Sequence, residues 1–164
     1  MKENSSIKEQ VLHPEQTAKA AAAKVREATE ENPDNCAEEL DERICAALRA
    51  ASDKKALDTV VLDLREVASF TDYFIITSGT NVRQVQAIAD EVVEQLKKQG
   101  TRAARVEGYN TAEWVLVDYG DFIVHVFEDK ARRFYDLERL WRDAKRVSLP
   151  PDVAGSDSSL RSEQ

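Results

Sequence analysis

The aromatic and proline residues divide this chain into a core and two flanking segments. All eleven aromatic side chains lie between Phe70 and Trp141, and all four prolines lie outside residues 36–147. Aromatic side chains bury the largest areas in a protein core, and proline interrupts helices and strands. We therefore predict a loosely ordered, alanine-rich extension over residues 1–35, one domain over 36–147 and a disordered acidic tail over 148–164.

Apolar residues recur at helical spacing in three segments of the predicted domain. The segments are Cys36–Ser52, Val82–Gln99 and Asp129–Trp141. The second has the most regular stripe, with a capping Asn81 before it and Gly100 after it. The third is expected to turn four apolar side chains inward: Phe134, Leu137, Leu140 and Trp141.

Five further segments are rich in apolar and β-branched residues, which favours strands. They are Leu57–Leu64, Asp72–Thr77, Ala103–Glu107, Trp114–Asp118 and Asp121–Phe127. Helices and strands then follow in the order α-β-β-α-β-β-β-α. This order predicts an α/β (α+β layered) domain, with a mixed five-stranded sheet flanked by helices.

The last two strands form a hairpin whose two faces differ in composition. With Tyr119-Gly120 as a two-residue loop, Asp118 would pair with Asp121, and Trp114 with His125. One face is then wholly apolar and reads as core: Val115, Val117, Phe122, Val124 and Val126. The other face mixes polar and apolar groups: Trp114, Leu116, Asp118, Asp121, Ile123, His125 and Phe127. We expect a helix to cover part of this mixed face and a partner to use the rest.

Several residues of this region allow two interpretations. His125 could act as a base oriented by Asp118 or Asp121, or could be a packed, hydrogen-bonded histidine. The two acids could bind a cation or could be solvated turn residues. Ser78-Gly79-Thr80 could bind an anion or cap a helix, and Arg132-Arg133 could bind phosphate or form a solvated helix face.

Charge and composition narrow the class of partner. The chain has 23 basic and 31 acidic residues, a net charge of −8. This balance disfavours binding to nucleic acid or anionic lipid and suits a basic partner, of which ribosomal proteins are the most abundant. There is no apolar run long enough to span a membrane and no signal-peptide core, and Glu3, Glu9 and Glu15 disfavour a mitochondrial leader. We expect a cytoplasmic protein.

Cys36 and Cys45 are the two cysteines, nine residues apart on one predicted helix. That spacing places them on opposite helix faces, too far apart for a disulfide. We expect small buried thiols in a reducing compartment. With two histidines and no C-x-x-C pair, the sequence predicts neither a zinc site nor a cofactor.

Motifs along the whole domain resemble the ribosomal silencing factor family, RsfS, also called Iojap or YbeB. They are Thr71–Ile76, Ser78–Thr80, Ala89-Asp90, Val106–Gly108, Thr111–Phe127 and Arg133–Trp141. The resemblance covers about residues 36–141, and the segment from Glu107 to Phe127, with its tryptophan, Gly-Asp hairpin and Val-His pair, is the most specific.

The resemblance implies that the chain binds ribosomal protein L-fourteen on the large subunit. Occupying that site blocks joining of the small subunit and represses translation; organelle relatives act in large-subunit assembly. It also implies a nucleotidyltransferase-like fold that lacks the catalytic carboxylates, because Asp90 and Glu91 are adjacent on a helix, and hence no enzyme activity. Carried onto this chain, the binding surface comprises Tyr109, Trp114, Asp118, Tyr119, Asp121, Phe122 and His125, with Tyr119 expected to be exposed at the hairpin tip.

Two alternatives remain open at this stage. The first is a nucleotide- or phosphate-processing enzyme that uses Asp72, Ser78 and His125. The second is a structural domain that forms a homodimer.

Overall fold

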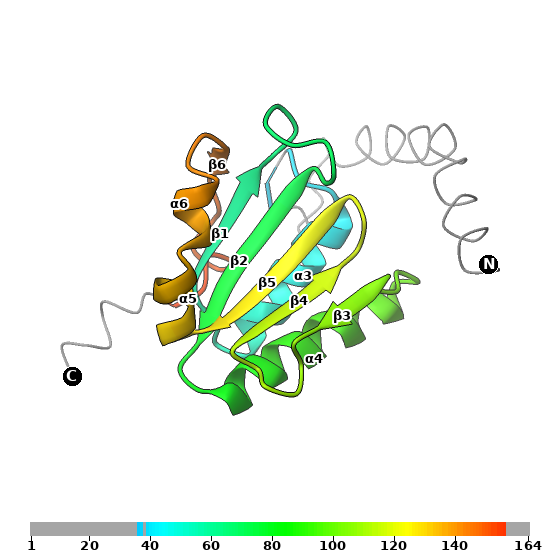
Figure 1. Cartoon of the computed structure of the whole chain (residues 1–164). Coiled ribbons are helices and arrows are strands. Elements are labelled where there is room, and N and C mark those ends of the chain that lie inside the picture. The colour runs from blue at the N-terminus through cyan, green and yellow to red at the C-terminus, as the bar shows by residue number, and fades with distance from the viewer. Residues whose placement is uncertain (1–35, 38, 157–164) are drawn as a thin grey trace, which may run out of the picture. The chain divides into compact units, whose positions relative to one another are not determined.

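The computed structural model describes residues 36, 37 and 39–156 (Figure 1). The predicted extension over 1–35 and residues 157–164 of the predicted tail lie outside the described residues. The elements are α3 (Glu42–Asp53), β1 (Leu57–Asp63), β2 (Tyr73–Gly79), α4 (Val82–Lys98), β3 (Arg105–Glu107), β4 (Trp114–Asp118), β5 (Phe122–Glu128), α5 (Asp129–Tyr135), α6 (Leu137–Leu140) and β6 (Lys145–Val147). No helix of the described part is long and apolar enough to cross a bilayer.

The strands form one mixed sheet in the order β3-β4-β5-β2-β1-β6. Strands β2 and β5 are parallel, and the other neighbours are antiparallel. The predicted mixed α/β architecture is confirmed, and the predicted count of five strands is one too low. The sixth strand, β6, has three residues, two of them exposed and charged, so it carries no apolar signal in the sequence.

Helices cover the two faces of the sheet unequally. Helices α3 and α4 pack together over one face, and Figure 1 shows them behind the strands. Helix α5 packs on the other face against β5 and β2. Each face therefore has its own apolar cluster, a larger one under α3 and α4 and a smaller one under α5 and α6.

Helix α4 begins and ends where the sequence predicts. The Asn81 side chain accepts a hydrogen bond from the Gln84 N–H at its start. Gly100 follows the helix with φ of +85°, a conformation that glycine adopts without steric cost. The predicted cap is confirmed, with Asn81 as the capping residue and Ser78 and Gly79 as the last residues of β2.

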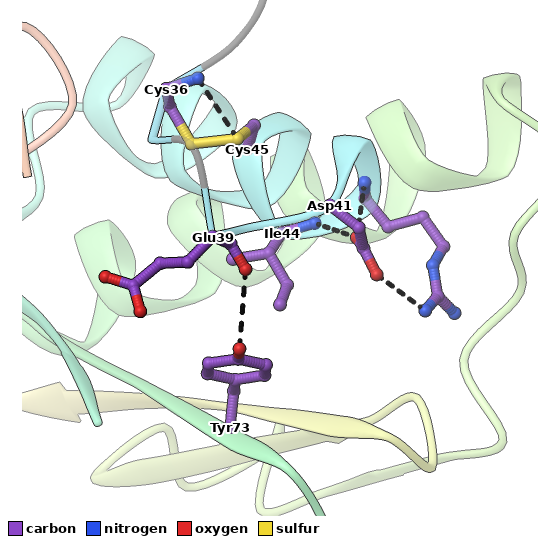
Figure 2. Close-up of a disulfide and its surroundings, with 7 residues drawn as sticks. Cys36, Glu39, Asp41, Ile44, Cys45 and Tyr73 are labelled. Carbon is purple, nitrogen blue, oxygen red and sulfur yellow. Dashed lines mark hydrogen bonds and ion pairs between the residues drawn. A yellow bond between two sulfur atoms is a disulfide. The ribbon is translucent and has the colours of Figure 1, made fainter. Parts of the chain in front are cut away.

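Helix α3 starts six residues later than predicted, and this reverses the prediction about the cysteines. The Asp41 side chain caps α3 by accepting from the N–H groups of Arg43 and Ile44. Cys36 lies before the helix, in a segment that folds back so that its Cα is 5.5 Å from that of Cys45. The two residues form a disulfide (Figure 2). The prediction of two free thiols was wrong because it placed both cysteines on one regular helix.

The predicted helix over Asp129–Trp141 is broken at Asp136. This residue is left-handed, with φ of +48°, and separates α5 from α6. The break turns Phe134 and Leu140 outward, with 80 % and 75 % of their surfaces exposed, whereas Leu137 is buried. The prediction that Phe134 and Leu140 pack inward was therefore wrong.

Residues 148–156 are ordered against β1, contrary to the predicted disorder after residue 147. The N–H groups of Asp58 and Thr59 donate to the carbonyls of Ser156 and Ala154. The Val153 side chain is buried in the larger cluster. Strand β1 is irregular at Asp58, where φ is +48°, and the returning segment supplies the hydrogen-bond partners that this stretch lacks in the sheet.

Candidate functional site

In the hairpin of β4 and β5 the strand residues lie on their predicted faces, but the two strands pair in a different register. Trp114 lies opposite Phe127 and Leu116 opposite His125, so each predicted pair is displaced by two residues. The Tyr119 N–H donates to the Phe122 carbonyl, which makes Gly120-Asp121 the tip. Because side chains alternate with a period of two, a two-residue shift leaves every strand residue on its predicted face.

Within the described residues, helix α5 packs mainly against β5 and β2 on the mixed face, and less on β4. Trp114, Leu116 and Asp118 of β4 are each half-buried and lie beyond the strands that α5 covers. We call these three residues the open face. Arg105 of β3 lies directly opposite Asp118, and their side chains form an ion pair of 3.4 Å. The sheet thus presents a tryptophan, a leucine and a paired carboxylate side by side.

Trp114 is held by the buried side chain of His125. The indole Nε1–H donates to the imidazole Nδ1 at 3.0 Å. His125 is only 3 % exposed, and the Phe74 ring packs edge-on against it at 4.4 Å. This burial lowers the pKa of His125 to about 3, so the imidazole is neutral and carries its proton on Nε2. The interpretation of His125 as a packed, hydrogen-bonded histidine is confirmed, and its hydrogen-bond partner is the Trp114 indole.

Tyr119 and Phe122 lie on the opposite side of the sheet, in the larger cluster. Their rings stack at 4.8 Å, and both are buried. Burial raises the pKa of the Tyr119 hydroxyl to about 12. The prediction of an exposed tyrosine at the tip was wrong, because the tip is one residue further along the chain. Asp121 occupies the tip, is exposed and forms an ion pair with Arg43 of α3.

Tyr109 lies apart from both groups, beside α4. Its hydroxyl donates to the Asp90 carboxylate at 3.0 Å, and its carbonyl accepts from the Gln86 side chain. The structure therefore divides the seven predicted binding residues into three places. Trp114, Asp118 and His125 share the mixed face, Tyr119, Phe122 and Asp121 lie toward α3, and Tyr109 lies along α4.

Exposed aromatic residues of α5 lie next to Trp114, and one of them, Phe134, was predicted to pack inward. The Tyr135 ring lies 5.0 Å from the Trp114 ring, and the Phe134 ring packs edge-on against Tyr135. Phe134, Tyr135 and Leu140 are the exposed large apolar residues of α5 and α6, and we refer to them together as the apolar patch. One signal was present in the sequence: Phe134 and Tyr135 are adjacent, and neighbouring residues on a helix point about 100° apart. A helix that turned Phe134 toward the core would therefore turn Tyr135 away from it.

The residues proposed for an enzyme do not converge. Asp72 and Ser78 lie at opposite ends of β2, about 20 Å apart at the rise of a strand. The Ser78 hydroxyl is buried and contacts the Leu57 carbonyl and Arg132. His125 lies between them in the sheet, opposite Ile76.

Arg132 and Arg133 differ in environment. The Arg132 guanidinium is largely buried and pairs with Glu138 at 3.0 Å, whereas Arg133 is exposed. The prediction of one solvated face is therefore wrong for Arg132. Among the described residues, no group of three or more histidine, cysteine or acidic side chains is arranged to hold a metal ion.

Comparison with known proteins agrees with this fold. Residues 37–164 match the family described as "Ribosomal silencing factor during starvation". Ribosomal silencing factor RsfS from Halalkalibacterium halodurans is 45 % identical over 103 residues, which is 63 % of this chain and 88 % of that protein. The mouse protein "Mitochondrial assembly of ribosomal large subunit protein 1" is 32 % identical over 91 residues, 54 % of this chain and 40 % of that one.

A solved structure from Bacillus halodurans has a similar fold. The two sequences are 42 % identical, and the alignment covers 66 % of this chain and 98 % of that chain. The structures superpose with a TM-score of 0.60. The family match over residues 37–164 includes the open face. This chain belongs to the ribosomal silencing factor (RsfS) family.

Proposed function

We propose that this protein binds ribosomal protein L-fourteen of the large ribosomal subunit and sterically blocks joining of the small subunit, which represses translation. The observation that carries the proposal is the open face with the adjoining apolar patch. Interfaces are anchored by aromatic side chains at a partly desolvated centre. Trp114 has this position, because a hydrogen bond to the buried His125 fixes its orientation and the Tyr135 ring packs beside it.

The contact is proposed to centre on Trp114 and Asp118, with Phe134, Tyr135 and Leu140 at its border. Asp118 contributes a carboxylate that is partly balanced by Arg105, and the chain as a whole is acidic. Tyr119 and Phe122 would act indirectly, by shaping the hairpin from the α3 side. We further propose that the protein acts in the cytoplasm, as a binding module without catalytic activity.

A second candidate function is a role in assembly of the large subunit. The observation in its favour is the similarity to the mouse protein whose name describes such a role. Both functions require a contact with the large subunit. Silencing alone requires that the bound protein excludes the small subunit.

Titration of purified L-fourteen with the full chain and its Trp114→Ala variant tests the contact. We expect the variant to lose at least tenfold in affinity, because removal of a central aromatic anchor costs about 2 kcal/mol or more. Phe134→Ala should weaken binding by a smaller factor without affecting the fold, since Phe134 is almost fully exposed. Full affinity in both variants would contradict the placement of the surface.

One variant on α4 serves as a control, and a second variant beside α4 tests how far the surface extends. Val82→Ala removes an exposed apolar side chain at the start of α4 that is not among the predicted binding residues, and we expect it to bind L-fourteen normally. Tyr109→Ala tests the seventh predicted residue: a loss of affinity would show that the surface extends to α4.

Sedimentation of ribosomal subunits then separates the two functions, because a silencing factor reduces the fraction of joined ribosomes when added to mature subunits. Light scattering of the free chain tests for a homodimer.

A further inference from the structure

The Cys36–Cys45 disulfide joins the first described residue to the start of α3. Its loop encloses Leu40, which is buried, and Asp41, which caps the helix. Figure 2 shows the bond lying across the beginning of the helix, with Tyr73 of β2 below the same segment. The Tyr73 hydroxyl donates to the Glu39 carbonyl at 3.4 Å.

The two sulfur atoms have different surroundings. Cys45 is the fourth residue of α3, only 1 % exposed, and its Sγ accepts a hydrogen bond from the Cys36 N–H at 3.3 Å. Cys36 precedes the helix and is 6 % exposed. The first turn of a helix and a hydrogen-bond donor both stabilise a negative sulfur, so Cys45 is the better leaving group. Both residues are buried, and Cys36 is the more exposed of the two, so we take Cys36 Sγ as the point of attack.

We propose that Cys36–Cys45 is a reversible thiol–disulfide exchange site, opened by a dithiol reductant that attacks Cys36 Sγ and expels Cys45. The attack forms a mixed disulfide between the reductant and Cys36 and breaks the bond to Cys45, which leaves as a thiolate. The second thiol of the reductant then attacks the reductant's first sulfur, which is bonded to Cys36 in the mixed disulfide. Cys36 is released as a thiolate. Two electrons pass from the dithiol to the protein disulfide, the reductant becomes a cyclic disulfide, and both cysteine thiolates take up protons from water.

Opening the bond loosens a segment that reaches the hairpin tip. Asp41 caps α3 and contacts Arg43, and Arg43 contacts both the Asp121 carboxylate and the Phe122 ring. The disulfide restricts this segment in the unfolded chain and holds it against α3 in the folded one. The reduced protein therefore keeps its fold but has a less protected helix start.

The experiment uses the full chain oxidised with glutathione disulfide and then treated with dithiothreitol under native conditions. Alkylation and intact mass count the free thiols, and we expect none before treatment and two after it. Reduction should lower the melting temperature by about 5–15 °C, as expected for a loop of this size in a small domain. Amide exchange of Arg43 and Ile44, whose N–H groups donate to Asp41, should accelerate on reduction.

Single-cysteine variants supply the matched controls. Cys36→Ser and Cys45→Ser should both melt at the temperature of the reduced protein and should not respond to dithiothreitol. With glutathione disulfide, the free cysteine of Cys45→Ser should form a mixed disulfide faster than that of Cys36→Ser. Three results would each overturn the proposal: two free thiols that persist after glutathione disulfide, a bond that dithiothreitol reduces only after unfolding, or faster modification of Cys45.

Discussion

Burial keeps the His125 imidazole neutral in the folded protein, and this links stability to pH. The pKa of His125 is lowered to about 3 by burial, whereas an unfolded histidine has a pKa of about 6.5. Between these values the unfolded chain binds one more proton than the folded chain. The free energy of unfolding should therefore be unaffected by His125 above pH 6.5 and fall below it, by up to about 1.4 kcal/mol per pH unit. Urea denaturation at pH 7, 5.5 and 4.5 measures this slope.

His125→Gln is the control for that titration. Glutamine cannot gain a proton and can still accept from the Trp114 indole, so its slope should be shallower than that of the natural chain. Equal slopes would mean that His125 does not titrate differently in the folded and unfolded states.

Two glycines with positive φ test how the chain approaches Trp114. A Cβ on Gly108 (φ +78°) would lie 2.1 Å from the Trp114 carbonyl oxygen, whereas a Cβ on Gly120 (φ +90°) meets no atom within 4 Å. Gly120→Ala should cost about 1 kcal/mol of stability for its backbone conformation. Gly108→Ala should cost about 1–3 kcal/mol more, because backbone must move as well. Chemical denaturation of both variants compares them; equal losses would contradict the close approach of Gly108 to β4.

At the scale of elements, the sequence predicts the helices and strands that a local pattern of apolar and capping residues determines. The stripe of α4, with Asn81 and Gly100 at its ends, fixes that helix almost to the residue. The alternation in β4 and β5 assigns the faces correctly although the loop is displaced. The break at Asp136 was not predictable from periodicity, because aspartate tolerates both helical and left-handed conformations and only the packing of α6 selects between them.

The segment after β6 gives a prediction at the same scale. Val153 is buried beside α3 and β1 although the sequence around it reads as a tail. Val153→Ala should lower the free energy of unfolding by about 1–2 kcal/mol through lost burial and the cavity left behind. Asp152→Ala, next to it and exposed, should change stability by less than about 0.5 kcal/mol. Thermal unfolding of the two variants distinguishes them, and equal stability would mean that the segment is not docked in solution.

At the scale of the whole molecule, the candidate site depends on contacts that no single motif contains. The hairpin carries Trp114, yet its orientation comes from His125 on the next strand and its flank from Tyr135 on α5. The seven predicted residues all lie between residues 109 and 125, but the sheet sends Tyr119 and Phe122 to one side and Trp114 and Asp118 to the other. Adjacent residues of a strand point to opposite faces of the sheet. A surface predicted from neighbouring hairpin residues therefore includes side chains from both faces.

The net charge of −8 predicts how the protein should find a basic ribosomal partner. Opposite charges accelerate encounter over distances of about a Debye length, which is ~10 Å at 0.1 M salt and ~4 Å at 0.5 M. We expect the association rate constant with L-fourteen to fall about tenfold between ~0.05 and ~0.5 M salt, while the dissociation rate constant changes much less. Surface plasmon resonance at several salt concentrations separates the two rate constants.

The Trp114→Ala variant gives the complementary result. Its truncation removes a short-range contact without changing charge, so it should raise the dissociation rate constant and keep the salt dependence of association. Asp118→Asn, which removes one negative charge beside Arg105, should instead slow association slightly. An association rate constant that ignores salt would mean that the acidic balance of the chain does not guide this encounter, and that the open face binds through its apolar residues alone.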